Sequence, residues 1–182
     1  MIYSVVGSGG KTTLIKNMAE KFRAEGKKVF VTTTTRMLIE ENCVLTDDAK
    51  TIIEELNRTG YAMAGVKEGE KIRALSPEIF KEVSAYADVT LVEADGSKHL
   101  PLKFPNGTEP VIPENADEII IVCGLNAIGQ KLKDVCHRPE LVKACLGADD
   151  ETVINHTHIQ KLVTEGYLKP LREKYTNAKI SI

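Results

Sequence analysis

Aromatic residues, net charge and long apolar runs are scarce in this chain, and their scarcity excludes several classes of protein. The 182 residues include no tryptophan, aromatic side chains make up only 5%, and the formal net charge is −2. A balance so close to neutral supplies no basic field to attract nucleic acid, so we do not expect nucleic acid as a partner. The longest apolar run, Ile119–Cys123, is far too short to span a bilayer.

Cysteine is rare as well, and no two cysteines form a Cys-x-x-Cys motif. The cysteines are Cys43, Cys123, Cys136 and Cys145. Isolated thiols of this kind are typical of a reducing compartment. A strand and a loop occupy the first residues and leave no room for a signal peptide, so we expect a cytoplasmic protein. The length and ordinary hydrophobic fraction of 42% fit one domain over residues 1–182.

The chain does contain a glycine-rich loop between an apolar segment and a helical one: Gly7, Ser8, Gly9, Gly10, Lys11, Thr12 and Thr13. Glycines allow successive backbone N–H groups to converge on one anion, and the N-terminus of the next helix adds positive potential. The loop therefore predicts a site for a nucleoside triphosphate, either ATP or GTP. Lys11 would reach the β- and γ-phosphates, and Thr12 would hold Mg²⁺.

This loop is shorter than the usual phosphate-binding pattern, because Val5 stands where that pattern has its first glycine. It resembles the loops of Mur-type ligases and of several nucleotide-dependent maturation factors. The plainer alternative is a glycine turn with an incidental lysine. The flanking pattern favours the nucleotide site, since Ile2–Val6 and Val29–Val31 predict buried strands around a helix that ends near Gly26.

Strands and helices alternate along the rest of the chain, which predicts a three-layer α/β/α fold with a mostly parallel central sheet, like that of P-loop NTPases. Further strands are predicted at Cys43–Leu45, Val89–Val92, Ile119–Cys123 and Lys179–Ile182. Further helices are predicted from Asp47 or Asp48 to Leu56, over Ser76–Tyr86, and near 139–146 and 157–164. Residues 61–75 suggest a hairpin, and residues 99–117 an ordered loop.

Acidic residues follow the predicted strand Val89–Val92, where Glu93, Asp95 and Gly96 come in quick succession. Ligands bind at the carboxyl ends of strands in open α/β sheets, and an acid there helps to hold Mg²⁺ in nucleotide sites. Glu93 is the first candidate for the metal-facing catalytic acid and Asp95 the second. The Gly96 amide is a candidate sensor of the γ-phosphate. A simple acidic turn is the alternative.

Other candidates lie near the same predicted edge of the sheet. Thr35 would complete the Mg²⁺ shell, and Arg36 would meet a phosphate or a carboxylate substrate. Alternatively, the threonine run packs within its strand. The basic groups of Ser97–Lys103, among them Lys98 and His99, are candidates for anion contact. So is the pair His137–Arg138, although for both segments a solvated loop is the alternative.

Six motifs together resemble one family: Gly-Ser-Gly-Gly-Lys-Thr-Thr, Thr-Thr-Thr-Thr-Arg-Met, Glu-Ala-Asp-Gly-Ser, Leu-Pro-Leu-Lys, Glu-Pro-Val-Ile-Pro and His-Arg-Pro-Glu. In this order they are similar to the selenium-dependent hydroxylase accessory protein family, also called YqeC. The resemblance covers residues 2 to about 146. It implies a phosphate-loop protein that takes part in maturation of selenium-containing molybdenum hydroxylases, with Lys11, Thr12, Glu93 and Asp95 in the nucleotide motifs.

Members of that family usually continue into an Asn-Lys-x-Asp-like segment, which resembles a base-recognition motif. This sequence ends at Ile182, where that segment should begin, so we expect a C-terminus that is shortened or a sheet that closes differently. Three functions remain open. The chain is an NTP-dependent maturation factor, a ligase or kinase that acts on a small anion, or a nucleotide-binding interaction module without turnover.

Overall fold

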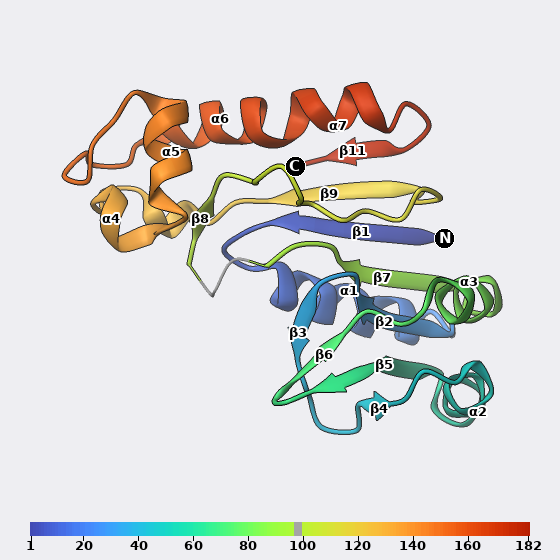
Figure 1. The fold of residues 1–182 in the computed structure, drawn as a ribbon. Coiled ribbons are helices and arrows are strands. Elements are labelled where there is room, and N and C mark those ends of the chain that lie inside the picture. The colour runs from blue at the N-terminus through green and yellow to red at the C-terminus, as the bar shows by residue number, and fades with distance from the viewer. Residues whose placement is uncertain (97–99) are drawn as a thin grey trace.

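A nine-stranded sheet runs through the middle of the molecule in a computed structural model that describes residues 1–96 and 100–182 (Figure 1). Its path is β11-β9-β1-β7-β2-β5-β6-β3, and β4 pairs separately with β5. The strands are β1 (Ile2–Gly7), β2 (Val29–Thr33), β3 (Arg36–Leu38), β4 (Val44–Leu45), β5 (Tyr61–Glu68), β6 (Lys71–Arg73), β7 (Val89–Glu93), β9 (Glu118–Val122) and β11 (Lys179–Ser181). Helices cover both faces, which confirms the predicted three-layer α/β/α class.

Most of the sheet is parallel, and only the pairs β5–β6 and β3–β6 are antiparallel. β7 lies between β1 and β2, so Glu93 stands opposite Val5 on one side and Thr33 on the other. The carboxyl ends of these three strands therefore meet at one edge of the sheet. This topology brings the glycine-rich loop, the acidic turn and the threonine run together.

The helix α1 (Lys11–Ala24) covers one face of the sheet. Successive residues of a strand point to opposite faces, so Val5 and Leu91 pack with Ile15 on this side while their neighbours turn away. On the opposite face, α2 (Ala49–Thr59) and α3 (Pro77–Tyr86) pack against Phe30. Asp48 caps α2 by accepting a hydrogen bond from the Thr51 amide.

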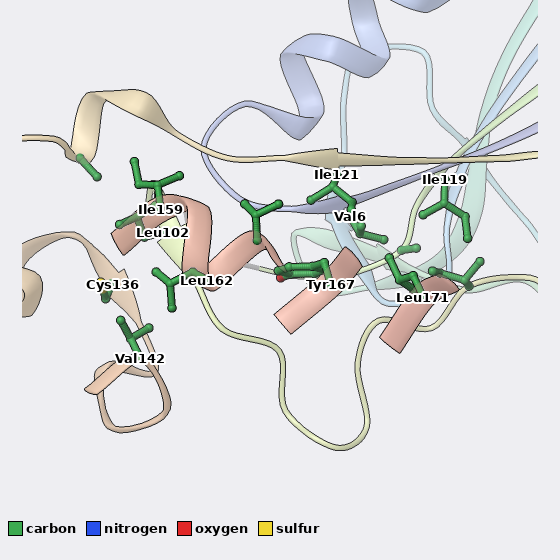
Figure 2. Close-up of a cluster of buried hydrophobic side chains, with 14 of the residues drawn as sticks. Val6, Leu102, Ile119, Ile121, Cys136, Val142, Ile159, Leu162, Tyr167 and Leu171 are labelled. Atoms are coloured by element: carbon green, nitrogen blue, oxygen red, sulfur yellow. The ribbon is translucent and has the colours of Figure 1, made fainter. Parts of the chain in front are cut away.

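The C-terminal third of the chain covers the rest of that second face. It contains α4 (Leu132–Val135), α5 (Pro139–Leu146), α6 (His156–Val163), a π-helical turn (Thr164–Leu168) and α7 (Lys169–Lys174). Figure 2 shows Leu162, Tyr167 and Leu171 packed near Val6 and Ile121 of the sheet. A small parallel sheet of β8 (Leu102–Lys103) and β10 (Cys136–His137) joins this layer to the edge described above.

The predicted strands and helices all occur, with small differences in their bounds. Residues 61–75 form the expected antiparallel pair, but β5 is also an inner strand that pairs with β2 in parallel. The segment 99–117, predicted as a loop, contains the short strand β8. β3, α4 and α7 were not predicted, because short elements carry too few residues for a periodic signal.

Among the described residues, no helix combines the length and the apolar character that crossing a bilayer requires.

Candidate nucleotide site

The loop between β1 and α1 takes its shape from glycines with positive φ angles. These angles are 91° at Gly7, 79° at Gly9 and 140° at Gly10, all in a range that residues with a side chain rarely adopt. Gly10 is the N-cap of α1 and, because it has no side chain, it does not cap the first turn of that helix. The first amides of α1 are therefore directed toward the loop, where an anion would satisfy them.

Space as well as conformation requires glycine in this loop. A Cβ on Gly7 would lie 2.1 Å from the Val122 carbonyl oxygen, and one on Gly9 would lie 2.5 Å from Gly124 Cα. Ser8 fixes the loop from the same side, because its amide donates to Val122 O at 2.9 Å and its hydroxyl donates to Pro101 O at 2.9 Å. The loop is thus a cradle held against the end of β9 and against Pro101.

Lys11, the first residue of α1, lies over this cradle. Its ammonium donates to the Gly7 carbonyl at 2.8 Å and is 3.2 Å from Asp95 Oδ1. Only 4% of the side chain is exposed. The Lys11 ammonium therefore lies next to the cradle, where the sequence predicts that it reaches the β- and γ-phosphates of a nucleotide.

Thr12 and Glu93 meet directly. The Thr12 hydroxyl donates a 3.0 Å hydrogen bond to Glu93 Oε2, although 81 residues separate the two in the sequence. The end of β2 holds the backbone of Glu93 in place, because the Thr33 hydroxyl and the Thr34 amide both donate hydrogen bonds to the Glu93 carbonyl. Thr12 and Glu93, two of the residues predicted on separate grounds to hold Mg²⁺, therefore lie side by side.

Asp95, the second acid, has a different environment. Its side chain is fully buried, and its Oδ2 atom accepts hydrogen bonds from the Gly7 amide at 3.0 Å and from the Tyr167 hydroxyl at 3.2 Å. Lys11 and Lys103 each place an ammonium 3.2 Å from the same carboxylate. Asp95 thus anchors the loop from behind, while Glu93 lines the open side.

A line of alternating charges continues from Asp95. Lys103, whose side chain is fully buried, donates to the Gly96 carbonyl at 2.6 Å and to Glu109 Oε2 at 2.7 Å. The same Glu109 oxygen accepts a 2.8 Å hydrogen bond from Arg138. Burial raises the pKa of Glu109, but its hydrogen bonds to Arg138 and Lys103 outweigh burial and hold that pKa below its ordinary value. Burial and the nearby Asp95 carboxylate raise the pKa of Tyr167 well above normal.

In the threonine run 32–35, some side chains bond to the backbone of neighbouring segments and Thr35 lines the site. Thr32 is buried and donates to the Ala64 carbonyl, whereas Thr34 donates to the Val111 carbonyl. Thr35 lies 3.4 Å, hydroxyl to hydroxyl, from Thr33 and lines the cleft described next. Arg36 opens β3 and forms an exposed ion pair with Glu68 on β5.

A cleft of about 1100 Å³ opens at this edge of the sheet. The glycine-rich loop and α1 contribute Gly9, Gly10, Lys11, Thr12 and Thr13 to its lining, and the strand ends contribute Thr35, Glu93 and Gly96. The β3–β6 side adds Arg36, Lys71 and Arg73, and the opposite side adds His137 and Arg138. Most of the predicted site residues therefore share one cavity. Lys98 and His99 lie outside the described residues.

The donor set fits Mg²⁺ held partly by substrate. In the described part of the chain, no group of three or more His, Cys, Asp or Glu side chains is arranged to hold a metal ion. Mg²⁺ is commonly bound through one or two carboxylates together with phosphate oxygens and water. Glu93 and the Thr12 hydroxyl would supply the protein part of such a shell, beside a cradle that a Cβ would fill.

Sequence reasoning missed Glu109 and Tyr167, and it assigned Lys103 a different contact. Lys103 belongs to a basic segment expected to touch an anionic substrate, yet its ammonium lies between Asp95 and Glu109. The available signal was a lysine directly after Leu102 in a non-polar stretch, a pattern that suggests a paired buried charge. Tyr167 offered no local signal at all.

Comparisons with known proteins identify the family to which this chain belongs. A protein-family model described as "YqeC protein" matches residues 3–140. The curated Escherichia coli (strain K12) protein named "Uncharacterized protein YqeC" is 34% identical over 139 residues, which cover 72% of this chain and 54% of that relative. The chain therefore spans about half the length of the curated relative it matches. No solved structure matches the chain.

Proposed function

Because this chain belongs to the YqeC protein family and places a glycine cradle beside Glu93, we propose that it binds a magnesium nucleoside triphosphate and hydrolyses it. The observation that carries the proposal is the 3.0 Å contact of Thr12 with Glu93 at the mouth of a loop with three positive-φ glycines. A structural turn would need neither the hydroxyl–carboxylate pair nor a nearly buried lysine at its centre.

Each residue has a distinct part in this proposal. The amides of Gly9, Gly10 and Lys11 bind phosphate oxygens, and the Lys11 ammonium exchanges its contact with the Gly7 carbonyl for the β- and γ-phosphates. Thr12 and Glu93 would hold Mg²⁺, which supplies charge neutralisation on the phosphates when bound. Thr35 and Gly96 line the same cleft, where the Thr35 hydroxyl and the Gly96 amide would contact the phosphate chain.

The partner in this proposal follows from the family resemblance. A maturation factor for a selenium-dependent molybdenum hydroxylase would hydrolyse nucleotide slowly on its own and faster with its partner. Acceleration of phosphate release by an added molybdenum hydroxylase is the expected result. Equal rates with and without that enzyme would remove the partner from the proposal but leave nucleotide hydrolysis in place.

The cleft itself favours a second candidate, a ligase or kinase that acts on a small anion. Its volume of about 1100 Å³ lies at the upper end for small-molecule sites, so it has room beyond a nucleotide. Arg36 and Arg73 stand directly opposite each other on β3 and β6 and line this cleft, and the Glu68 carboxylate pairs with Arg36. An anionic co-substrate could bind beside these two guanidinium groups. Product formation from ATP and such an anion would favour this candidate.

Titration of ATP, GTP and CTP with Mg²⁺ by calorimetry tests the proposal, with Lys11→Ala as the key variant. A charge-assisted hydrogen bond contributes about 1.5–3 kcal/mol, so Lys11→Ala should weaken binding roughly 10- to 100-fold. Its fold should survive, since Asp95 keeps Lys103 and the Gly7 amide as partners. Lys21→Ala, at the exposed far end of α1, is the matched control. Wild-type affinity in Lys11→Ala, or no binding by the parent protein, would refute the proposal.

A further inference from the structure

Arg138 has an unusual backbone conformation for its residue type. It is the N-cap of α5 with a φ of 58°, and among the described residues only Asn42 shares a positive φ without being glycine. Asparagine tolerates this left-handed conformation, whereas arginine rarely adopts it. Such strain persists where surrounding contacts enforce it, and it is concentrated at functional sites.

The contacts that enforce this conformation are buried and charged. β10 pairs with β8 so that His137 stands opposite Lys103, which sets the position of the next residue, Arg138. Glu109 accepts hydrogen bonds from both Lys103 at 2.7 Å and Arg138 at 2.8 Å through one oxygen. Lys103 is in turn fixed by Asp95 and by the Gly96 carbonyl. The guanidinium group is therefore held in place from behind.

The open side of Arg138 faces the cleft. Its side chain is 24% exposed, and it lines the same cavity as Gly9, Gly10 and Lys11. A guanidinium has more N–H donors than its one hydrogen bond to Glu109 uses. The hydrogen bond to Glu109 is the main cause of the raised pKa of Arg138, and the charge of Asp95 adds to it.

We propose that Arg138 binds the terminal phosphate of the nucleotide, and that Glu109 and Lys103 act as its positioning residues. This inference rests on the proposed function and deepens it. A guanidinium fork matches phosphate oxygens, and phosphoryl transfer is accelerated mainly by positioning and neutralisation of charge on that group. In hydrolysis, water bonds to the γ-phosphorus, the bond to the β–γ bridging oxygen breaks, and a proton passes to solvent.

The test compares nucleoside triphosphate with diphosphate, because only the former carries the phosphate that Arg138 contacts. Dissociation constants for both, with Mg²⁺, and phosphate release are measured for the parent and for Arg138→Ala. We expect triphosphate affinity to fall roughly tenfold, diphosphate affinity to change less than about twofold, and turnover to fall roughly 1000-fold. Arg138→Lys should recover only part of the loss, because lysine lacks the planar fork. Lys143→Ala, on the same helix and paired with Asp150, should match the parent.

Glu109→Gln tests the positioning role separately. It should reduce the ratio of triphosphate affinity to diphosphate affinity about three- to tenfold without abolishing binding. Guanidinium ion added to the solution should restore turnover in Arg138→Ala but not in Glu109→Gln, because Glu109 positions the guanidinium group. If the parent binds no nucleotide, both this inference and the proposed function fail. If the parent binds and hydrolyses nucleotide while Arg138→Ala keeps the parent's selectivity and rate, only this inference is overturned.

Discussion

The backbone amide of Gly7 donates a 3.0 Å hydrogen bond to Asp95 Oδ2, so the first glycine of the loop is tied to a carboxylate 88 residues further along the chain. Asp95 is also the meeting point of two ammonium groups, Lys11 and Lys103. One buried carboxylate therefore fixes the loop, the first turn of α1 and the buried charges behind the cleft. Four predictions follow from this arrangement and its surroundings.

Removal of the Asp95 carboxylate should destabilise the whole domain. Asp95→Ala leaves the buried Lys103 with Glu109 as its remaining carboxylate partner and leaves the Gly7 amide unsatisfied. Breaking one side of a buried ion pair costs about 3–5 kcal/mol, to be measured by urea denaturation. Asp150→Ala breaks only an exposed pair with Lys143 and should cost about 0–1 kcal/mol. A loss below about 1 kcal/mol in Asp95→Ala would contradict this role.

Gly9→Ala should lower the free energy of unfolding by more than the strain of a left-handed backbone angle alone would cost. The new Cβ would lie 2.5 Å from Gly124 Cα, so the backbone must shift and the cradle must open. Gly69→Ala is the matched control, because Gly69 has a similar φ of 63° and no atom near the Cβ position. The control should lose about 1–2 kcal/mol from the left-handed conformation alone.

Nucleotide binding gives the second measurement for this glycine pair. We expect Gly9→Ala to lose measurable affinity for Mg-nucleotide, while Gly69→Ala binds like the parent because it lies outside the loop. Equal losses of stability and equal affinities in the two variants would show that the close approach of Gly9 to Gly124 is unimportant.

Glu93→Gln should separate turnover from binding. Glutamine keeps the size of the side chain and a hydrogen-bond acceptor for Thr12, but it removes the negative charge that would hold Mg²⁺. Turnover should fall roughly 100-fold and require more Mg²⁺, with nucleotide affinity changed less than about threefold. Phosphate release at several Mg²⁺ concentrations measures this, with the exposed Glu20→Gln on α1 as the control. Full activity in Glu93→Gln would assign the metal to another residue.

The contribution of Glu109 to stability should depend on pH. Its pKa is lower in the folded protein than in the unfolded chain, where the ordinary value is 4.5. Its charged form therefore stabilises the fold above pH 4.5, and that contribution disappears as the pH falls through the lower folded-state pKa. The difference in unfolding free energy between the parent and Glu109→Gln should shrink between about pH 6 and about pH 3. A difference that stays constant over this interval would mean that Glu109 is not charged in the folded protein.

Much of the site could be predicted because its signals are local. The glycine spacing before Lys11 describes a backbone conformation, and the acids after Val89–Val92 mark the end of an apolar strand. The structure places these segments together at one edge of the sheet because β7 lies between β1 and β2. The sequence ranked Glu93 ahead of Asp95 as the metal-facing acid, but it did not predict that Asp95 is buried beneath the loop and bound to the Gly7 amide.

The remaining site residues depend on contacts between distant segments. Tyr167 reaches Asp95 across 72 residues, and Arg138 reaches Glu109 across 29 residues. No periodic pattern records such pairs, because burial of a charge depends on which partner the fold places beside it. Lys103 illustrates this point, since the same side chain would be a surface lysine without Asp95 and Glu109 nearby.

The order of residues by itself determined the glycine loop, the apolar strands and the acids that follow one of them, because backbone freedom and side-chain alternation act over a few neighbours. Only the tertiary structure decided that Glu93 faces the cleft while Asp95 anchors the loop, and that Lys103 turns inward to support Arg138. The physical reason is that a buried charge is stable only beside its partner, and that partner comes from a remote part of the chain.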